Sequence, residues 1–176
     1  MELFTLSLAL LIVITVSALA TYMIWKLLIC NVPLVSSGKR IAKKMIELAE
    51  LSENQNIYDL GCGTGIILFE TEKKFPKNKF TGYEIVRPAI WYSQLKAKLT
   101  KSKIQFKCED FFQADISDAD IIFCYLWPSI MDKFHTKKWS ELKPGTKIIS
   151  HGFPISGLDP KQKYQSGRLS IFVYEK

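Results

Sequence analysis

The chain has 176 residues with 24 basic and 17 acidic side chains, and its formal net charge is +7. This length leaves room for one ordinary domain and little else, which excludes an assembly of several large domains. The four cysteines show no CxxC spacing and there are two histidines, so the sequence indicates no metal site. We expect the cysteines to be reduced thiols that pack as small apolar groups.

Residues 3–25, near the amino terminus, form a segment without any charged side chain. A helix of this length rises roughly 35 Å, which is enough to cross a hydrocarbon core of about 30 Å. We therefore expect a single transmembrane anchor over residues 1–30. The alternative is a cleaved signal peptide, because Ala18-Leu19-Ala20 resembles a processing site; the acidic Glu2 and the length of the apolar run argue against it.

Basic residues follow this segment at Lys26, Lys39, Arg40, Lys43 and Lys44. The positive-inside rule then predicts a single-pass membrane protein whose carboxy-terminal domain faces the cytoplasm. Without Glu2 and Lys26, 23 basic and 16 acidic residues remain, so the net charge of +7 belongs to that domain. Nucleic acid is one explanation for the excess. We favour an anionic bilayer, where juxtamembrane basic residues gain about 1 kcal/mol each.

A linker over residues 31–38 separates the anchor from a domain over residues 39–176, because Pro33 and two serines prevent the helix from continuing. Apolar spacing predicts helices over 39–51, 65–74, 88–100 and 129–142, and strands over 56–60, 79–84, 104–108, 118–125 and 146–151. A weak strand at 162–165 and a last strand at 168–174 form a hairpin. The alternation predicts an α/β fold, a Rossmann-like, mostly parallel twisted sheet with helices on both faces and an antiparallel carboxy-terminal edge strand.

The first strand runs into a glycine turn, Gly61-Cys62-Gly63-Thr64-Gly65. This Gly-x-Gly-x-Gly turn is one residue shorter than the Gly-x-Gly-x-x-Gly of dinucleotide sites, which weakens an NAD interpretation. Glycines allow a tight turn, partly at positive φ, and let backbone N–H groups approach a ligand without a Cβ in the way. Asp59 precedes the turn, and Glu84 ends the next strand.

These motifs resemble the seven-strand S-adenosylmethionine-dependent methyltransferases. The resemblance implies that Asp59 holds the methionyl end of S-adenosylmethionine and that Glu84 takes the ribose hydroxyls. Acceptors suit this cofactor, which carries a sulfonium, an ammonium and a diol. The resemblance also implies that Asp110 and Phe111 contact the adenine, although an acidic turn capping a strand end is the alternative for Asp110. The expected cofactor-binding residues are Asp59, Gly61, Cys62, Gly63, Gly65, Glu84, Asp110 and Phe111.

The fourth strand leads into Cys124-Tyr125-Leu126-Trp127-Pro128. Methylases of adenine and glutamine amides usually carry Asn/Asp-Pro-Pro-Tyr/Phe there, so a nucleobase amine or side-chain amide is disfavoured. A narrower resemblance covers nearly the whole domain, to small archaeal and membrane-anchored mitochondrial protein-lysine methyltransferases. It rests on Val32-Pro33-Leu34-Val35, Gly82-Tyr83-Glu84, Trp91-Tyr92-Ser93, Asp110-Phe111-Phe112, Asp115-Ile116-Ser117, 141–146 and Ser150-His151. One departure is Thr64-Gly65-Ile66, where those relatives commonly have Asp-Gly-Arg.

Methylation of a lysine requires that its side-chain ammonium first loses a proton. A free lysine, with a pKa near 10.4, is neutral less than about 0.1% of the time at pH 7. A desolvated pocket beside a cationic sulfonium disfavours the ammonium. Tyr125 and Trp127 are the candidate catalytic residues, as aromatic walls of a lysine channel; core packing is the alternative. His151 is either a proton acceptor or, as we favour, a histidine satisfied by backbone, and Trp91 and Tyr92 are expected to be packing residues.

We therefore predict a membrane-anchored S-adenosylmethionine-dependent protein-lysine methyltransferase. Its expected partners are a protein lysine and, through the amino-terminal helix, the lipid bilayer; we expect neither nucleic acid nor a metal. Two alternatives stay open, methylation of a lipid or quinone headgroup and a non-catalytic membrane adaptor on the same fold. An RNA methylase, suggested by the basic balance, is disfavoured because about 145 residues hold the catalytic fold with no appended RNA-binding module. The retained acids Asp59, Glu84 and Asp110 argue against the adaptor, because it has no use for a cofactor site.

Overall fold

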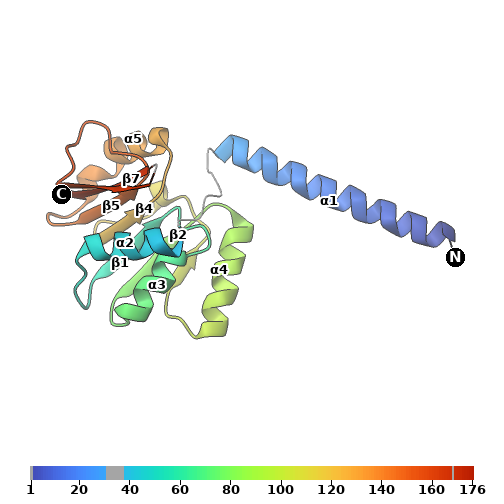
Figure 1. Cartoon of the computed structure of the whole chain (residues 1–176), viewed down its shortest axis with the longest axis horizontal. Coiled ribbons are helices and arrows are strands. Elements are labelled where there is room, and N and C mark those ends of the chain that lie inside the picture. Colours follow the sequence, from blue (N-terminus) through green and yellow to red (C-terminus); the bar gives the residue numbers. More distant parts are fainter. Residues whose placement is uncertain (1, 31–37, 168) are drawn as a thin grey trace. The chain divides into compact units, whose positions relative to one another are not determined.

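The computed structural model describes residues 2–30, 38–167 and 169–176. The chain divides into two units, Met1–Leu34 and Val35–Lys176, drawn in Figure 1. The predicted linker over residues 31–38 lies outside the described residues except for Gly38.

The first unit contains one helix, α1 (Glu2–Cys30). Its segment Ser7–Ile24 has a mean hydropathy of 2.2 and is long and apolar enough to cross a membrane, by length and composition only. The predicted apolar helix is therefore confirmed as a helix. A signal sequence near the amino terminus would pass the same test.

The second unit is built on a seven-stranded sheet with the order β3-β2-β1-β4-β5-β7-β6. Strands β1 to β5 run parallel, and β7 is antiparallel to both β5 and β6. The strands are β1 (Asn56–Leu60), β2 (Lys79–Tyr83), β3 (Gln105–Lys107), β4 (Ile121–Cys124), β5 (Lys147–His151), β6 (Gln162–Ser166) and β7 (Leu169–Glu175). The predicted fold class is confirmed. The strand order reverses between β1 and β4, and ligands bind at the carboxyl ends of strands beside such a switch point.

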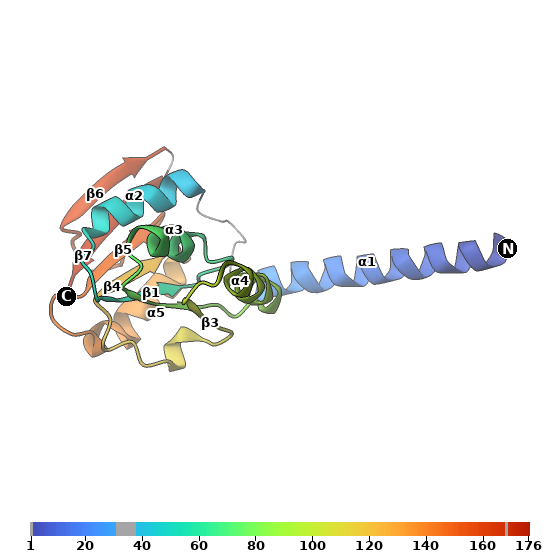
Figure 2. The same ribbon diagram turned by 90° about the horizontal axis from the view of Figure 1, so that it is seen from below.

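Helices cover both faces of this sheet (Figure 2). One face carries α2 (Lys39–Ala49), α3 (Ile66–Lys74) and α4 (Arg87–Thr100), which share a core with Ile57, Ile121 and Phe123. The other carries α5 (Pro128–Lys137) and the short 3₁₀ helices η1 (Phe111–Gln113) and η2 (Trp139–Glu141), around Leu60 and Ile122. Successive strand residues thus point to opposite faces, which fixes which side chains reach each core.

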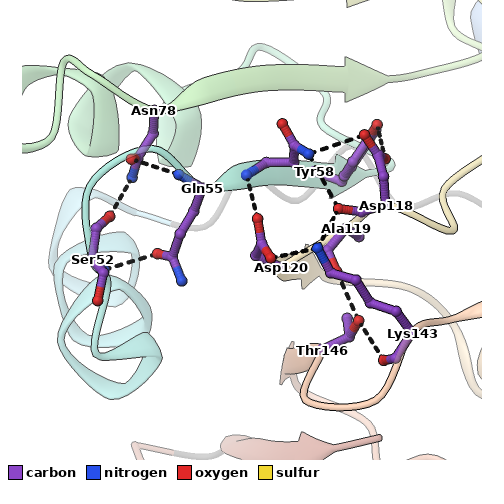
Figure 3. Close-up of polar contacts among 10 residues, drawn as sticks. Ser52, Gln55, Tyr58, Asn78, Asp118, Ala119, Asp120, Lys143 and Thr146 are labelled. Atoms are coloured by element: carbon purple, nitrogen blue, oxygen red, sulfur yellow. Dashed lines mark hydrogen bonds and ion pairs between the residues drawn. The ribbon is translucent and has the colours of Figure 1, made fainter.

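Strand β4 begins three residues later than predicted, where the side chains of the two preceding aspartates bond to residues of β1 (Figure 3). The Asp118 carboxylate accepts hydrogen bonds from Asn56 Nδ2 at 3.0 Å and from the Tyr58 hydroxyl at 2.8 Å. The Asp120 carboxylate accepts from the Asn56 backbone N–H at 2.7 Å and forms an ion pair with Lys143. These polar contacts hold the amino ends of β1 and β4 together, at the opposite edge of the sheet from the ligand side.

Helix α5 ends at Lys137 rather than continuing to residue 142 as predicted. The next residue, Lys138, is buried, and its Nζ donates to the Ala114 carbonyl at 2.8 Å and pairs with Glu141 at 2.7 Å. These contacts hold the Lys138 ammonium near η1, and after α5 the chain continues in the tighter 3₁₀ helix η2. The interpretation of the cysteines holds for the buried Cys62 and Cys124, whereas Cys108 is exposed and does not pack.

Candidate active site

The glycine turn joins β1 to α3 and is closed by bonds within the protein. The N–H groups of Gly61 and Cys62 both donate to the Tyr83 carbonyl at 2.9 Å, and the Gly65 N–H donates to the Cys62 carbonyl at 2.8 Å. The Gly63 N–H donates to Glu84 Oε2 at 3.0 Å. These four N–H groups are therefore not free for a ligand, contrary to the expectation that they approach it. The turn can therefore contribute to a binding site through the shape of its backbone rather than through these N–H donors.

Three glycines of this turn have positive φ, and two also lack space for a Cβ. A Cβ on Gly61 would lie 2.8 Å from Leu126 Cδ2, and one on Gly65 would lie 2.5 Å from the Phe106 ring. Gly63 is different, because it has a φ of +51° and nothing within 4 Å of the position its Cβ would take. The backbone at Gly63 therefore borders open space, as a cradle for a ligand requires. The Cys62 thiol points the other way, toward Gly82.

Glu84 follows β2, and its carboxylate is held by three backbone donors. Oε1 accepts from the N–H groups of Ile85 at 2.8 Å and Val86 at 2.9 Å, while Oε2 accepts from Gly63. Each carboxylate oxygen can accept about two hydrogen bonds, so Oε2 keeps capacity for one more donor. The side chain is buried. Its orientation is thus fixed before any ligand arrives, and a hydroxyl donor suits the remaining position.

Asp59 is the second buried carboxyl of the site, with 5% of its surface exposed. Burial, and after it the charge of nearby Glu84, raises the pKa of Asp59 to about 8. Among the described residues, no donor forms a hydrogen bond to this side chain. A buried carboxyl without a donor or a cation is protonated at pH 7, and a cation placed beside it would favour its charged form. It fits a ligand that brings positive charge, as S-adenosylmethionine does.

Asp110 and Phe111 lie where β3 passes into η1. Asp110 Oδ1 accepts from the Phe112 N–H at 3.0 Å and so caps η1, which is the structural role weighed for it from the sequence. Phe111 is buried and its ring centroid lies 4.3 Å from that of Phe112. Their contact with the adenine stays a prediction.

The residues expected to meet the methyl acceptor lie after β4 and β5. The Tyr125 ring centroid lies 4.5 Å from that of His151, and Trp127 stacks on Phe153 at 5.8 Å with 39% of its surface exposed. Leu126, between them, contacts Gly61 of the glycine turn. The segment after β4 therefore adjoins the cofactor side of the site through Leu126.

His151 is buried, and its Nδ1 has no hydrogen-bond partner among the described residues. The interpretation of a histidine satisfied by neighbouring backbone is therefore wrong for this nitrogen. Burial lowers the pKa of His151 below its usual value, so the ring is neutral at pH 7. A neutral imidazole with an unused nitrogen beside Tyr125 is able to exchange a proton.

Sequence reasoning missed one residue that shapes the turn. Ser93, fully buried on α4, donates through Oγ to the carbonyls of Gly63 at 3.2 Å and Ala89 at 3.0 Å. Its signal in the sequence is its place in the tripeptide Trp91-Tyr92-Ser93. Trp91 and Tyr92 are exposed, so their interpretation as packing residues is wrong.

Comparison with known proteins finds a family model, curated relatives and a solved structure. The model of the ANTKMT methyltransferase domain matches residues 59–162. A protein-lysine N-methyltransferase of Saccharolobus islandicus (strain REY15A) is 33% identical over 150 residues, covering 82% of this chain and 92% of that protein. An adenine nucleotide translocase lysine N-methyltransferase of Mus musculus is 23% identical over 171 residues, covering 90% and 74%.

An RNA methyltransferase from Salinibacter ruber, solved with S-adenosyl-L-homocysteine, has a TM-score of 0.76 and 28% identity. The similarity covers 80% of this chain and 93% of that one. The region matched by the family model begins at Asp59 and so includes the glycine turn, Glu84 and the segment after β4.

Proposed function

Since the chain belongs to the family of the ANTKMT methyltransferase domain, we propose that it methylates the side-chain amine of a protein lysine. It is an S-adenosylmethionine-dependent methyltransferase, as its family and its likeness to a methyltransferase solved with S-adenosyl-L-homocysteine indicate. The lysine acceptor is supported by the two curated relatives, both named as lysine N-methyltransferases.

Two carboxyl groups carry the assignment of the cofactor residues. We propose that Asp59 pairs with the ammonium of the methionyl end and that Glu84 Oε2 accepts from a ribose hydroxyl. The support is that Asp59 has no donor among the described residues, whereas Glu84 is already oriented by Gly63 and two further N–H groups. Gly61, Cys62, Gly63 and Gly65 shape the cradle, and Asp110 and Phe111 are assigned to the adenine.

The bound cofactor supplies an electrophilic methyl group on a sulfonium. The protein must present a lysine whose Nζ has lost its proton and point its lone pair at that methyl carbon, in line with the bond to sulfur that breaks. We propose that Tyr125 and Trp127 line the path of this lysine. Their aromatic faces receive the ammonium, and the low-polarity surroundings then favour the neutral amine.

His151 is proposed as the first acceptor of the lysine proton, because its Nδ1 is buried without a partner beside Tyr125. His151→Gln should lower the methylation rate at pH 7 by about 100-fold or more, the lower end of the range for proton transfer by a side chain. The loss should shrink toward pH 9.5, where free lysine deprotonates more readily. The measurement is the pH profile of kcat/KM.

The matched control is His135→Gln, the other histidine, which lies half-exposed on α5 against Trp139. Its profile should equal that of the unmodified protein. A His151→Gln loss that is the same at every pH would mean that the ring only supports packing, and the proton assignment would then fail.

We also propose the domain division, with residues 1–30 as a single-pass anchor and residues 39–176 as the catalytic domain facing the cytoplasm. The support is the length and apolar composition of α1 and the basic residues that follow it. Among the residues that the structure describes, the two cores of this unit are made of residues from position 41 onward, so we expect it to fold without α1.

The decisive experiment incubates a fragment of residues 31–176 with S-adenosylmethionine labelled on its methyl group and a membrane extract. We expect label in protein, at lysines identified by mass spectrometry. Label confined to the organic phase would replace the lysine assignment with a lipid or quinone headgroup. No transfer, despite cofactor binding, would favour the non-catalytic adaptor.

A further inference from the structure

Helix α4 carries an apolar stripe on its outer side. Trp91 is 76% exposed, Leu95 58% and Leu99 75%, and Tyr92 beside them is 55% exposed. Residues 91, 95 and 99 are four apart, so they lie on one side of the helix. Outside α1, five of the seven exposed large apolar side chains among the described residues lie between Ile85 and Leu99. We call this surface the α4 stripe.

The α4 stripe is not the face that holds the helix on the sheet. Ala89, Ile90, Ser93 and Ala97 are buried, and Gln94 bonds to the Phe106 carbonyl of β3. A helix covering a sheet normally presents polar residues to water on its other side. The neighbouring helix α3 does so with Lys73 and Lys74, whereas α4 carries exposed apolar side chains as well as buried ones. Such a surface indicates a binding partner.

Charge identifies the class of partner. The stretch 85–108 contains six basic residues and no acidic one: Arg87, Lys96, Lys98, Lys101, Lys103 and Lys107. On α4 itself, Arg87 and Lys98 project along one flank of the stripe, whereas Lys96 on the other flank lies with its Nζ 4.0 Å from the centroid of the Phe69 ring. Exposed leucines and a tryptophan bordered by lysine and arginine are the composition of a helix that lies in a membrane interface.

We propose that the α4 stripe binds the surface of an anionic bilayer, as a second membrane contact beyond α1. Nucleic acid would use the lysines and the Trp91 ring, but the bases have no stacking partner in Leu95 and Leu99. Lipid uses both features, because the apolar side chains enter the acyl boundary while the basic ones meet the headgroups. This proposal does not depend on methyl transfer, since binding is measured without cofactor or acceptor.

Helix α4 begins at Arg87, shortly after β2 ends at Tyr83, so its first turn adjoins Glu84 and the carboxyl edge of the sheet. Trp91 and Tyr92 are the residues of the stripe nearest to this first turn, so their contact with lipid would keep the edge that holds the candidate active site close to the bilayer surface. Acceptor lysines near the headgroups of membrane proteins would then be favoured over those of soluble proteins.

The test is sedimentation of the 31–176 fragment with vesicles of phosphatidylcholine alone or mixed with phosphatidylglycerol. We expect binding to the mixed vesicles, weakened at least about tenfold by Leu95→Ser with Leu99→Ser and also by Lys98→Glu with Lys101→Glu. The matched controls are Tyr164→Ser, an exposed aromatic on β6, and Lys137→Glu at the end of α5. Both controls should bind like the unmodified fragment.

Three results would overturn the proposal. The fragment does not bind mixed vesicles, or it binds them equally well with both leucines replaced. The third result is that the fragment binds no vesicles but self-associates or binds single-stranded RNA, and that the leucine variant loses this property. Loss of self-association would assign the stripe to a second copy of the chain, and loss of RNA binding would assign it to nucleic acid. Thermal unfolding of every variant, with an unchanged midpoint, separates these outcomes from misfolding.

Discussion

Asp59→Ala and Glu84→Ala are each expected to abolish detectable binding of S-adenosylmethionine. Removing one partner of a buried, hydrogen-bonded charge pair costs about 2–5 kcal/mol, which corresponds to at least about 30-fold in Kd. Asp59 is assigned to the ligand's positive charge, and Glu84 also anchors Gly63 of the cradle. Isothermal titration calorimetry on the 31–176 fragment measures both. Unchanged affinity in both variants would show that the cofactor residues are misassigned.

The pH dependence separates charge from shape at Asp59. Because its pKa is raised, the carboxyl is protonated in the free protein at pH 7 and must release a proton to pair with a cation. Affinity for S-adenosylmethionine should therefore rise with pH up to about 8, with proton release that Asp59→Asn eliminates. The heat of binding in buffers of different ionisation enthalpy reports this release directly.

Stability of the free protein provides the control for folding. A carboxyl whose pKa is higher in the folded than in the unfolded chain stabilises the fold fully below the unfolded value of about 3.9, and this contribution is lost as pH rises toward 8. Asp59→Asn removes that loss, so its Tm relative to the unmodified protein should increase between pH 5 and pH 8. A variant that binds the cofactor more weakly yet is the more stable one cannot owe its defect to unfolding.

The strands of the sheet could be predicted from the sequence because the spacing of apolar residues and the positions of the glycines reflect local structure. Strand β1 agrees in its bounds, and the carboxy-terminal hairpin is present, although β6 rather than β7 takes the edge. The predicted bounds of β4 and α5 were wrong, because contacts with residues far away in the sequence determine where these elements begin or end. Asp118 bonds to a strand 60 residues earlier in the chain, and Lys138 bonds to η1, so neither β4 nor α5 extends to its predicted limit.

The candidate site was predictable only as a set of residue types. The motif indicated two acids and a glycine turn. It did not reveal that the N–H groups of the turn form hydrogen bonds within the protein or that the Ser93 hydroxyl donates to the Gly63 carbonyl. The free Nδ1 of His151 also depends on tertiary contacts that no spacing encodes. The exposure of Trp91 was missed because an apolar residue on a helix is normally assigned to the core.

Tyr125→Ala is expected to lower kcat/KM for a lysine-containing protein by roughly 30- to 100-fold, with the Kd of S-adenosylmethionine unchanged within about threefold. The basis is the loss of an aromatic face for the ammonium, worth about 2 kcal/mol when desolvated, together with admission of water to the channel. Trp127→Ala should act in the same direction but less strongly, because Trp127 is partly exposed. Steady-state kinetics and cofactor titration measure the two quantities separately.

Tyr125→Phe is the matched control, since it keeps the aromatic face and removes only the hydroxyl. It should retain most of the activity if the face is what matters, whereas a loss equal to that of Tyr125→Ala would assign the role to the hydroxyl. Tyr125 also packs against His151 and Gly152, so a purely structural role is a real alternative. In that case Tm and cofactor affinity would fall together with activity in Tyr125→Ala, and Trp127→Ala, on the exposed side, would leave kcat/KM unaltered.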